Sequence, residues 1–81
     1  MKPDVKIFPN PARDVLNVEL SNANETSVVK IFSATGELVK TFVTGVNKNN
    51  LQINVSGLAR GVYAINIITG VEMKSFTFIK L

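Results

Sequence analysis

Apolar and polar residues alternate along most of the chain, and a helical period of 3.6 residues is almost absent. An alternation with period two is typical of β-strands that bury one face. Glycine, asparagine and proline separate the alternating runs at short intervals, as turn residues do. We therefore expect strands at residues 5–8, 15–20, 27–32, 38–44, 51–55, 61–69 and 72–80.

The same alternation predicts which side chains face the core in most of these strands. In the strand at 38–44 both faces carry apolar residues, and in the strand at 72–80 the facing is also ambiguous, so the pattern leaves the inward side of both strands open. For the others, the side chains expected to face inward are Leu16, Val18, Leu20, Val29, Ile31, Leu51, Ile53, Val55, Tyr63, Ile65 and Ile67.

The number and spacing of the strands indicate the fold class. About seven short strands, with turns roughly every eight to twelve residues, are typical of an antiparallel, immunoglobulin-like β-sandwich. No connection is long enough to hold the crossover helix that parallel strands need. We expect an all-β sandwich with the first and last strands at sheet edges.

Prolines and a glycine mark two of the connections between the strands. Pro9-Asn10-Pro11 follows the first strand; since proline fixes φ and keeps its predecessor extended, we expect a rigid segment that carries the chain from one sheet to the other. Gly36 supplies the positive φ of a tight hairpin turn. A direct binding role for Asn10 is the weaker alternative.

The stretch from Ser56 to Tyr63 resembles the corner before the penultimate strand of immunoglobulin-like domains. There a tyrosine hydroxyl bonds back to the preceding corner, and Tyr63 is in the matching place. Leu58 is expected to close the end of the core, and Gly61 to permit the bend.

Size and composition limit the function. The chain has 81 residues, which suits one domain, and it contains no cysteine or histidine. The usual general bases, nucleophiles and metal ligands are therefore missing, and we expect neither an enzyme nor a cofactor. The nine lysines and arginines, against six acidic residues, are scattered rather than clustered, which argues against nucleic-acid binding. No apolar run is long enough for a membrane helix.

Four stretches together carry a resemblance to a known family: FPNPARDVLNVEL at 8–20, VVKIFSATGELVKTF at 28–42, LQINVSGLARGVYAINI at 51–67 and SFTFIKL at 75–81. In order and spacing they resemble the type A C-terminal sorting domain of the Por (type IX) secretion system of Bacteroidetes. The resemblance spans nearly the whole chain. It implies that residues 1–81 are one domain excised from a longer secreted protein.

The resemblance also implies a route and its partners. The full-length protein passes through the periplasm, and the outer-membrane translocon and its shuttle protein recognise this domain. A sortase-like cysteine peptidase then cuts upstream of it, and the passenger reaches the cell surface or the medium.

In this family the final strand is the part most closely tied to the signal. Carried over, the recognition residues are Phe76, Phe78, Ile79, Lys80 and Leu81, whereas Pro9, Asn10, Pro11, Gly36, Leu58, Gly61 and Tyr63 belong to motifs that maintain the fold. We expect a partner to add a strand to the last strand, which Phe78→Pro would prevent. The same edge predicts a homodimer.

Two other classes of function remain open from sequence. One is an accessory immunoglobulin-like module that binds carbohydrate or acts as a spacer in a surface protein, for which Phe32 and Phe42 are the candidate exposed aromatics. The other is a strand-donating subunit of an adhesin or pilus.

Overall fold

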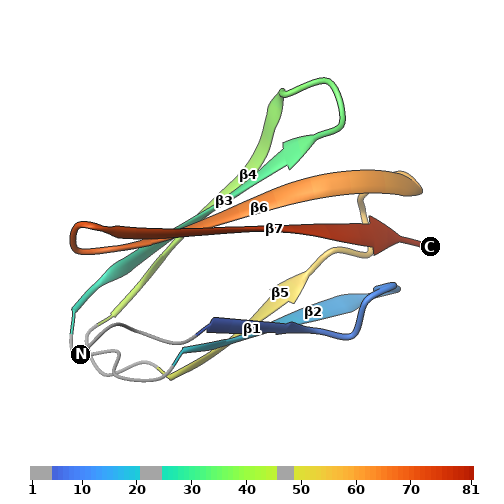
Figure 1. The fold of residues 1–81 in the computed structure, drawn as a ribbon. Helices are drawn as coiled ribbons and strands as arrows, with labels where there is room; N and C mark the ends of the chain where they lie inside the picture. Colours follow the sequence, from blue (N-terminus) through green and yellow to red (C-terminus); the bar gives the residue numbers. More distant parts are fainter. Residues whose placement is uncertain (1–4, 21–24, 46–48) are drawn as a thin grey trace.

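The computed structural model describes residues 5–20, 25–45 and 49–81. The connections between the strands expected at 15–20 and 27–32, and between those expected at 38–44 and 51–55, lie partly outside these residues. The described chain is all β, without helices (Figure 1). Its strands are β1 (Val5–Phe8), β2 (Val15–Leu20), β3 (Ser27–Ser33), β4 (Leu38–Thr44), β5 (Asn50–Asn54), β6 (Gly61–Thr69) and β7 (Glu72–Lys80).

The strands form two antiparallel sheets that pack face to face. One has the order β1-β2-β5 and the other the order β4-β3-β6-β7. Figure 1 shows the two layers, with β1 below β7. In the constant-type immunoglobulin fold the fourth strand joins the first sheet, whereas here β4 pairs with β3 in the second. The predicted sandwich is confirmed, with β1 and β7 both at sheet edges.

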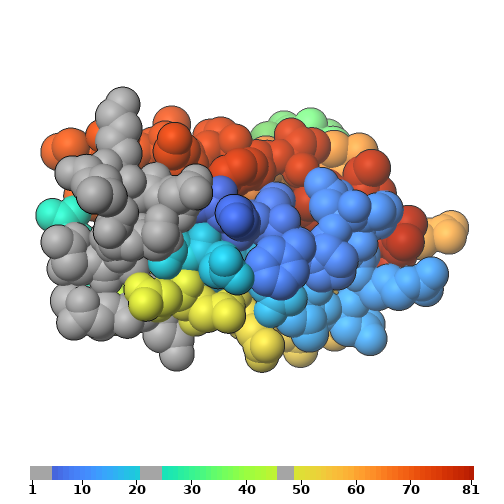
Figure 2. Space-filling model, turned by 60° about the horizontal axis from the view of Figure 1, so that its bottom comes forward, coloured from blue at the N-terminus to red at the C-terminus, as the bar shows by residue number. Residues whose placement is uncertain are grey.

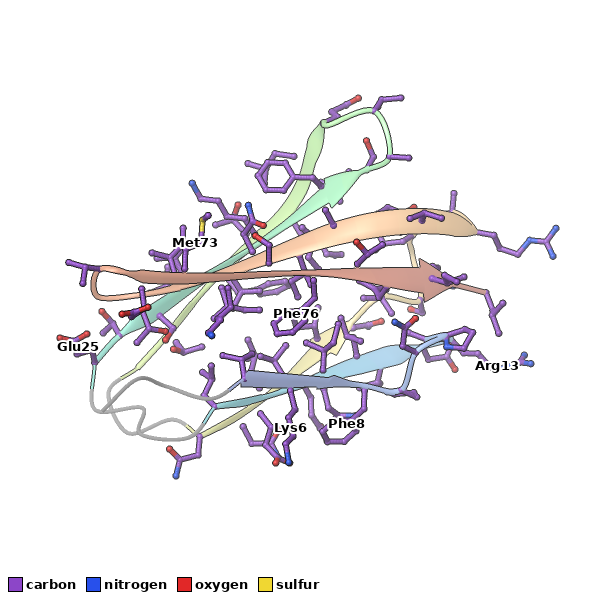
Figure 3. All side chains as sticks on the ribbon, viewed as in Figure 1. Lys6, Phe8, Arg13, Glu25, Met73 and Phe76 are labelled. Carbon is purple, nitrogen blue, oxygen red and sulfur yellow. The ribbon has the colours of Figure 1, made fainter. Side chains whose placement is uncertain are left out.

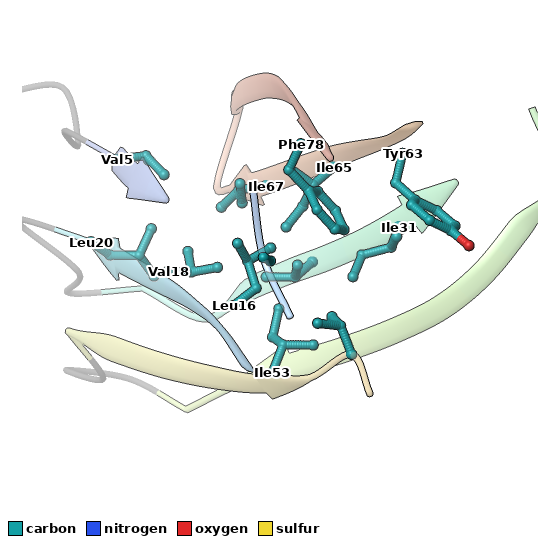
Figure 4. Packing of buried hydrophobic residues seen from close by; sticks show 13 residues of the cluster. Val5, Leu16, Val18, Leu20, Ile31, Ile53, Tyr63, Ile65, Ile67 and Phe78 are labelled. Carbon is teal, nitrogen blue, oxygen red and sulfur yellow. The ribbon is translucent and has the colours of Figure 1, made fainter. Parts of the chain in front are cut away.

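The core lies between the two sheets and is built by the inward half of each alternation. Leu16, Ile31, Ile53, Ile65 and Phe78 are among its fully buried side chains, and Figure 4 shows them meeting across the gap between the layers. Full burial of such a side chain contributes about 1.5–3 kcal/mol. Every side chain predicted to face inward is buried or packs against this core.

The facing of β4, which the pattern left open, is set by an irregularity in its pairing. Phe42 lies opposite Val29 and packs against the core, but the register shifts by one residue next to Phe32, which pairs with Leu38. A bulge of this kind reverses the alternation of side chains beyond it. The apolar residues of β4 therefore divide between the two faces.

The expectation that the proline segment carries the chain from one sheet to the other is confirmed in part. After β1, Ala12 forms a parallel bridge with Lys80 of β7, at the edge of the four-stranded sheet. The chain then returns to the first sheet, where β2 pairs with β1 and Phe8 lies opposite Asn17. We define residues Pro9–Ala12 as the proline segment; both of its X-Pro bonds are cis.

Candidate functional site

The terminal strand β7 is the candidate site, and its side chains alternate between the core and the surface. Of the five residues predicted for recognition, Phe78 is fully buried, Phe76 is half-buried, and Lys80 is 7% exposed. Ile79 and Leu81 are each 44% exposed. Two of the five therefore present a large apolar surface to a partner.

The two phenylalanines of β7 are held by the core. The rings of Phe78 and Tyr63 stack with centroids 5.5 Å apart, a favourable arrangement for an aromatic pair. Phe76 lies between β7 and β1, on the side opposite to Met73 (Figure 3). These contacts hold the terminal strand in position, and they leave little of either phenylalanine ring exposed for a partner.

Lys80 turns its side chain toward the inner side of the sandwich. Its Nζ donates a hydrogen bond of 2.6 Å to the carbonyl oxygen of Leu81. The ammonium group thus has a partner within the chain, which reduces the cost of its burial. A role for Lys80 in holding the end of β7 fits this geometry better than a free charge on the surface.

The proline segment, which connects β1 and β2 of the other sheet, is bonded to the outer edge of β7. The side-chain amide of Asn10 donates to the carbonyl oxygen of Thr77 at 3.1 Å and accepts from the N–H of Ile79 at 2.9 Å. The backbone N–H of Ala12 donates to Ile79 at 2.7 Å, and the carbonyl oxygen of Ala12 accepts from Leu81 at 2.8 Å. Figure 2 shows the blue residues of the N-terminal part of the chain next to red atoms of its C-terminal part.

This contact limits where a partner strand could pair with the edge of β7. The carbonyl oxygen of Thr77, both backbone groups of Ile79 and the N–H of Leu81 already have partners, so a new strand there must first displace Asn10 and Ala12. The Phe78→Pro substitution does not isolate strand addition, because Phe78 is a core residue paired with Tyr63 on β6. The hydrogen bonds of Asn10 to β7 were not predicted from the sequence. Its position between two prolines, which fix the backbone around the amide side chain, was the one sequence feature that pointed to them.

The corner before β6 agrees with its prediction. The hydroxyl of Tyr63 donates a hydrogen bond of 2.7 Å to the carbonyl oxygen of Ala59, and Leu58 packs against the core. Gly61 has φ +153°, a conformation that side chains rarely permit. Gly36 has φ +88° in the β3–β4 hairpin. Gly61 lies opposite Lys80 and Tyr63 opposite Phe78, so the start of β6 supports the end of the terminal strand.

The aromatic residues do not form a sugar-binding platform over the described part of the chain. Phe42 packs against the core and Phe32 is half-buried, so neither matches the exposed rings that a carbohydrate module needs. Phe8, at the end of β1, is the more exposed ring at 42%. Among the described residues, no helix has the length and apolar character of a membrane span, and no cluster of three or more acidic side chains is arranged to hold a metal.

Comparison with known families agrees with the geometry of the fold and its terminal strand. The family model described as the secretion system C-terminal sorting domain (Por secretion tail) matches residues 6–80, from β1 to the end of β7. No curated protein matches the chain. Because the match covers nearly the whole sandwich, the chain belongs to the C-terminal sorting domain family of the Por (type IX) secretion system, whose members are sorting signals rather than catalytic domains.

Proposed function

We propose that this domain is the last module of a longer secreted protein and acts as its address label. The translocon of the outer membrane and its shuttle protein read the label from the periplasmic side. A sortase-like cysteine peptidase then cuts ahead of β1, so that the passenger continues to the cell surface or the medium without the domain. The domain itself performs no catalysis.

The observation that carries the proposal is the extent of the family match, which runs through all seven strands to Lys80. The position of β7 at a sheet edge supports recognition there, because an edge strand presents both backbone groups and side chains to a partner. Ile79 and Leu81 supply exposed apolar contacts. Phe76, Phe78 and Lys80 contribute by holding the strand in place.

Cleavage is tested with a reporter fused ahead of residues 1–81 in a Bacteroidetes host. Mass spectrometry of the exported reporter is compared between cells with an active sortase and cells whose sortase lacks its catalytic cysteine. We expect a reporter that ends upstream of β1 in the first case and one that retains the domain in the second. An exported reporter with the domain still attached in both hosts would contradict removal by the sortase.

A further inference from the structure

The outer edge of β7 is divided into two halves. In an antiparallel pair, successive residues point their backbone groups alternately toward the neighbouring strand and away from it. The proline segment bonds to backbone groups of Thr77, Ile79 and Leu81, so the N–H and C=O groups of the odd-numbered residues point away from β6. By the same alternation, the backbone N–H and C=O groups of Met73 and Ser75 also point away from β6. At Met73 and Ser75 these outward backbone groups have no hydrogen-bond partner within residues 5–20, 25–45 and 49–81, and we call residues Glu72–Ser75 the open edge.

The open edge has side chains of different character on its two faces. Met73 is 59% exposed on the outer face of the four-stranded sheet. It lies opposite Ile68, which lies next to Val28, which in turn pairs with Val43. This apolar row crosses the whole sheet and ends at the edge with Met73. On the inner side, Glu72 and Lys74 are both half-buried.

The sequence Glu72-Met73-Lys74 is complementary to itself when two copies run antiparallel. With Met73 opposite Met73 of a second chain, each Glu72 lies opposite Lys74 of the other. Opposite charges placed directly across a strand pair are stabilising, whereas like charges are destabilising. The two methionines join the two apolar rows into one, and Met73 of each chain exchanges two backbone hydrogen bonds with its counterpart.

Other two-fold registers lack this match. A pair centred on Lys74 sets two lysines against each other, and one centred on Ser75 sets Lys74 against Phe76. A pair centred on Phe76 or beyond reaches the part of the edge that Asn10 and Ala12 occupy. The register centred on Met73 needs pairing only from Val71 to Ser75, so it ends before the proline segment.

We infer that the open edge of β7 is the interface of a two-fold homodimer centred on Met73, in which the two four-stranded sheets become one continuous sheet held by two Glu72–Lys74 ion pairs. The occupant is a second copy of this chain because the copy supplies both the apolar side chain and the charge that each position requires. A closed two-fold pair uses the open edge of both chains, so association stops at two. This self-association is independent of the sorting role.

Charge reversal tests the register. Sedimentation of residues 1–81 over a concentration series is expected to show one chain at low concentration and two at high concentration. Lys74→Glu alone and Glu72→Lys alone each convert both ion pairs to like charges and lower the association constant at least about tenfold. An equimolar mixture of the two variants restores association, because one chain is now acidic and the other basic at this edge.

The hydrogen-bonding arm uses Ser75, whose N–H points away from β6. Ser75→Pro removes that donor without removing a bond to β6, whereas Ser75→Ala keeps it; both lose the hydrogen bond of the Ser75 hydroxyl to Asn66. We expect the proline variant to stay a monomer and the alanine variant to dimerise, with unchanged far-ultraviolet circular dichroism in both. A wild-type chain that stays monomeric throughout, association beyond two, or a charge-reversed mixture that does not associate overturns the proposal.

Discussion

At the scale of the residue, the side chain of Asn10 makes hydrogen bonds to β7 that the backbone of a neighbouring strand would otherwise make. Its amide donates to one backbone group of β7 and accepts from the next, as a paired strand would. The side chain belongs to the connection between β1 and β2, so these bonds cross from one sheet to the other. A single asparagine therefore helps to fix the end of the terminal strand.

Asn10→Ala removes both bonds, and we expect it to lower the free energy of unfolding by about 1–2 kcal/mol in urea titrations. Hydrogen exchange at the Ile79 amide should become faster because that N–H loses its acceptor. Asn17→Ala is the matched control, since it removes one side-chain bond to Phe8 within the first sheet. Equal protection of Ile79 in the two variants would show that Asn10 does not hold the edge.

Tyr63 is the second residue with a definite cost. Tyr63→Phe removes the bond to the Ala59 carbonyl oxygen and keeps the ring stacked on Phe78, so we expect a loss of about 1 kcal/mol in the free energy of unfolding. Sorting by the folded variant should remain close to normal. Complete loss of sorting in a variant that is still folded would mean that the corner is read directly by a partner.

At the scale of the element, the alternation of β7 places the side chains that stabilise the core on one face and the exposed side chains on the other. Phe78→Ala leaves a cavity in the core and is expected to cost about 3–5 kcal/mol, most of what a domain this small has to spare. Ile79→Ala, one residue away on the surface, should change the free energy of unfolding by no more than about 0.5 kcal/mol. Chemical denaturation of both variants checks this; similar losses for both would contradict the facing described here.

The exposed end of β7 should matter for sorting more than for folding. In a double variant, Ile79→Ser with Leu81→Ser, the fold is expected to persist while export of a fused reporter drops sharply, since its apolar contacts are removed. Val15→Ser is the control, because Val15 is comparably exposed on the other sheet. Normal export of the double variant would place the recognition elsewhere on the domain.

Much of this element-level description could be predicted from the sequence, because period two shows both the strands and their facing wherever one face is polar. In β4 the pattern left the inward side open because both faces carry apolar residues, and the register shift beside Phe32 could not be seen from sequence. The partner of the proline segment also could not be derived. Two prolines fix local backbone angles, but the partner of Asn10 lies 67 to 69 residues away on β7, and only the tertiary structure brings them together.

At the scale of the whole molecule, hydrogen bonds join the N-terminal part of the described chain, through the proline segment, to the terminal strand β7. β1 lies below β7, and the proline segment that follows β1 is bonded to the last residues of the chain (Figure 1). The N-terminal side of the domain, from which a passenger would extend, is therefore hydrogen-bonded to β7, the strand that we propose for recognition. A partner that displaces the proline segment would disturb both.

Secretion of a reporter tests whether this sandwich directs a passenger through the Por system. Residues 1–81 are fused behind a signal peptide and a fluorescent reporter, in a Bacteroidetes host with or without a working Por translocon. We expect reporter at the surface or in the medium only when the translocon is intact, and retention in the periplasm when the folded double variant, Ile79→Ser with Leu81→Ser, replaces the wild-type domain. Reporter that stays in the periplasm in both hosts, although the domain is folded, would contradict the account.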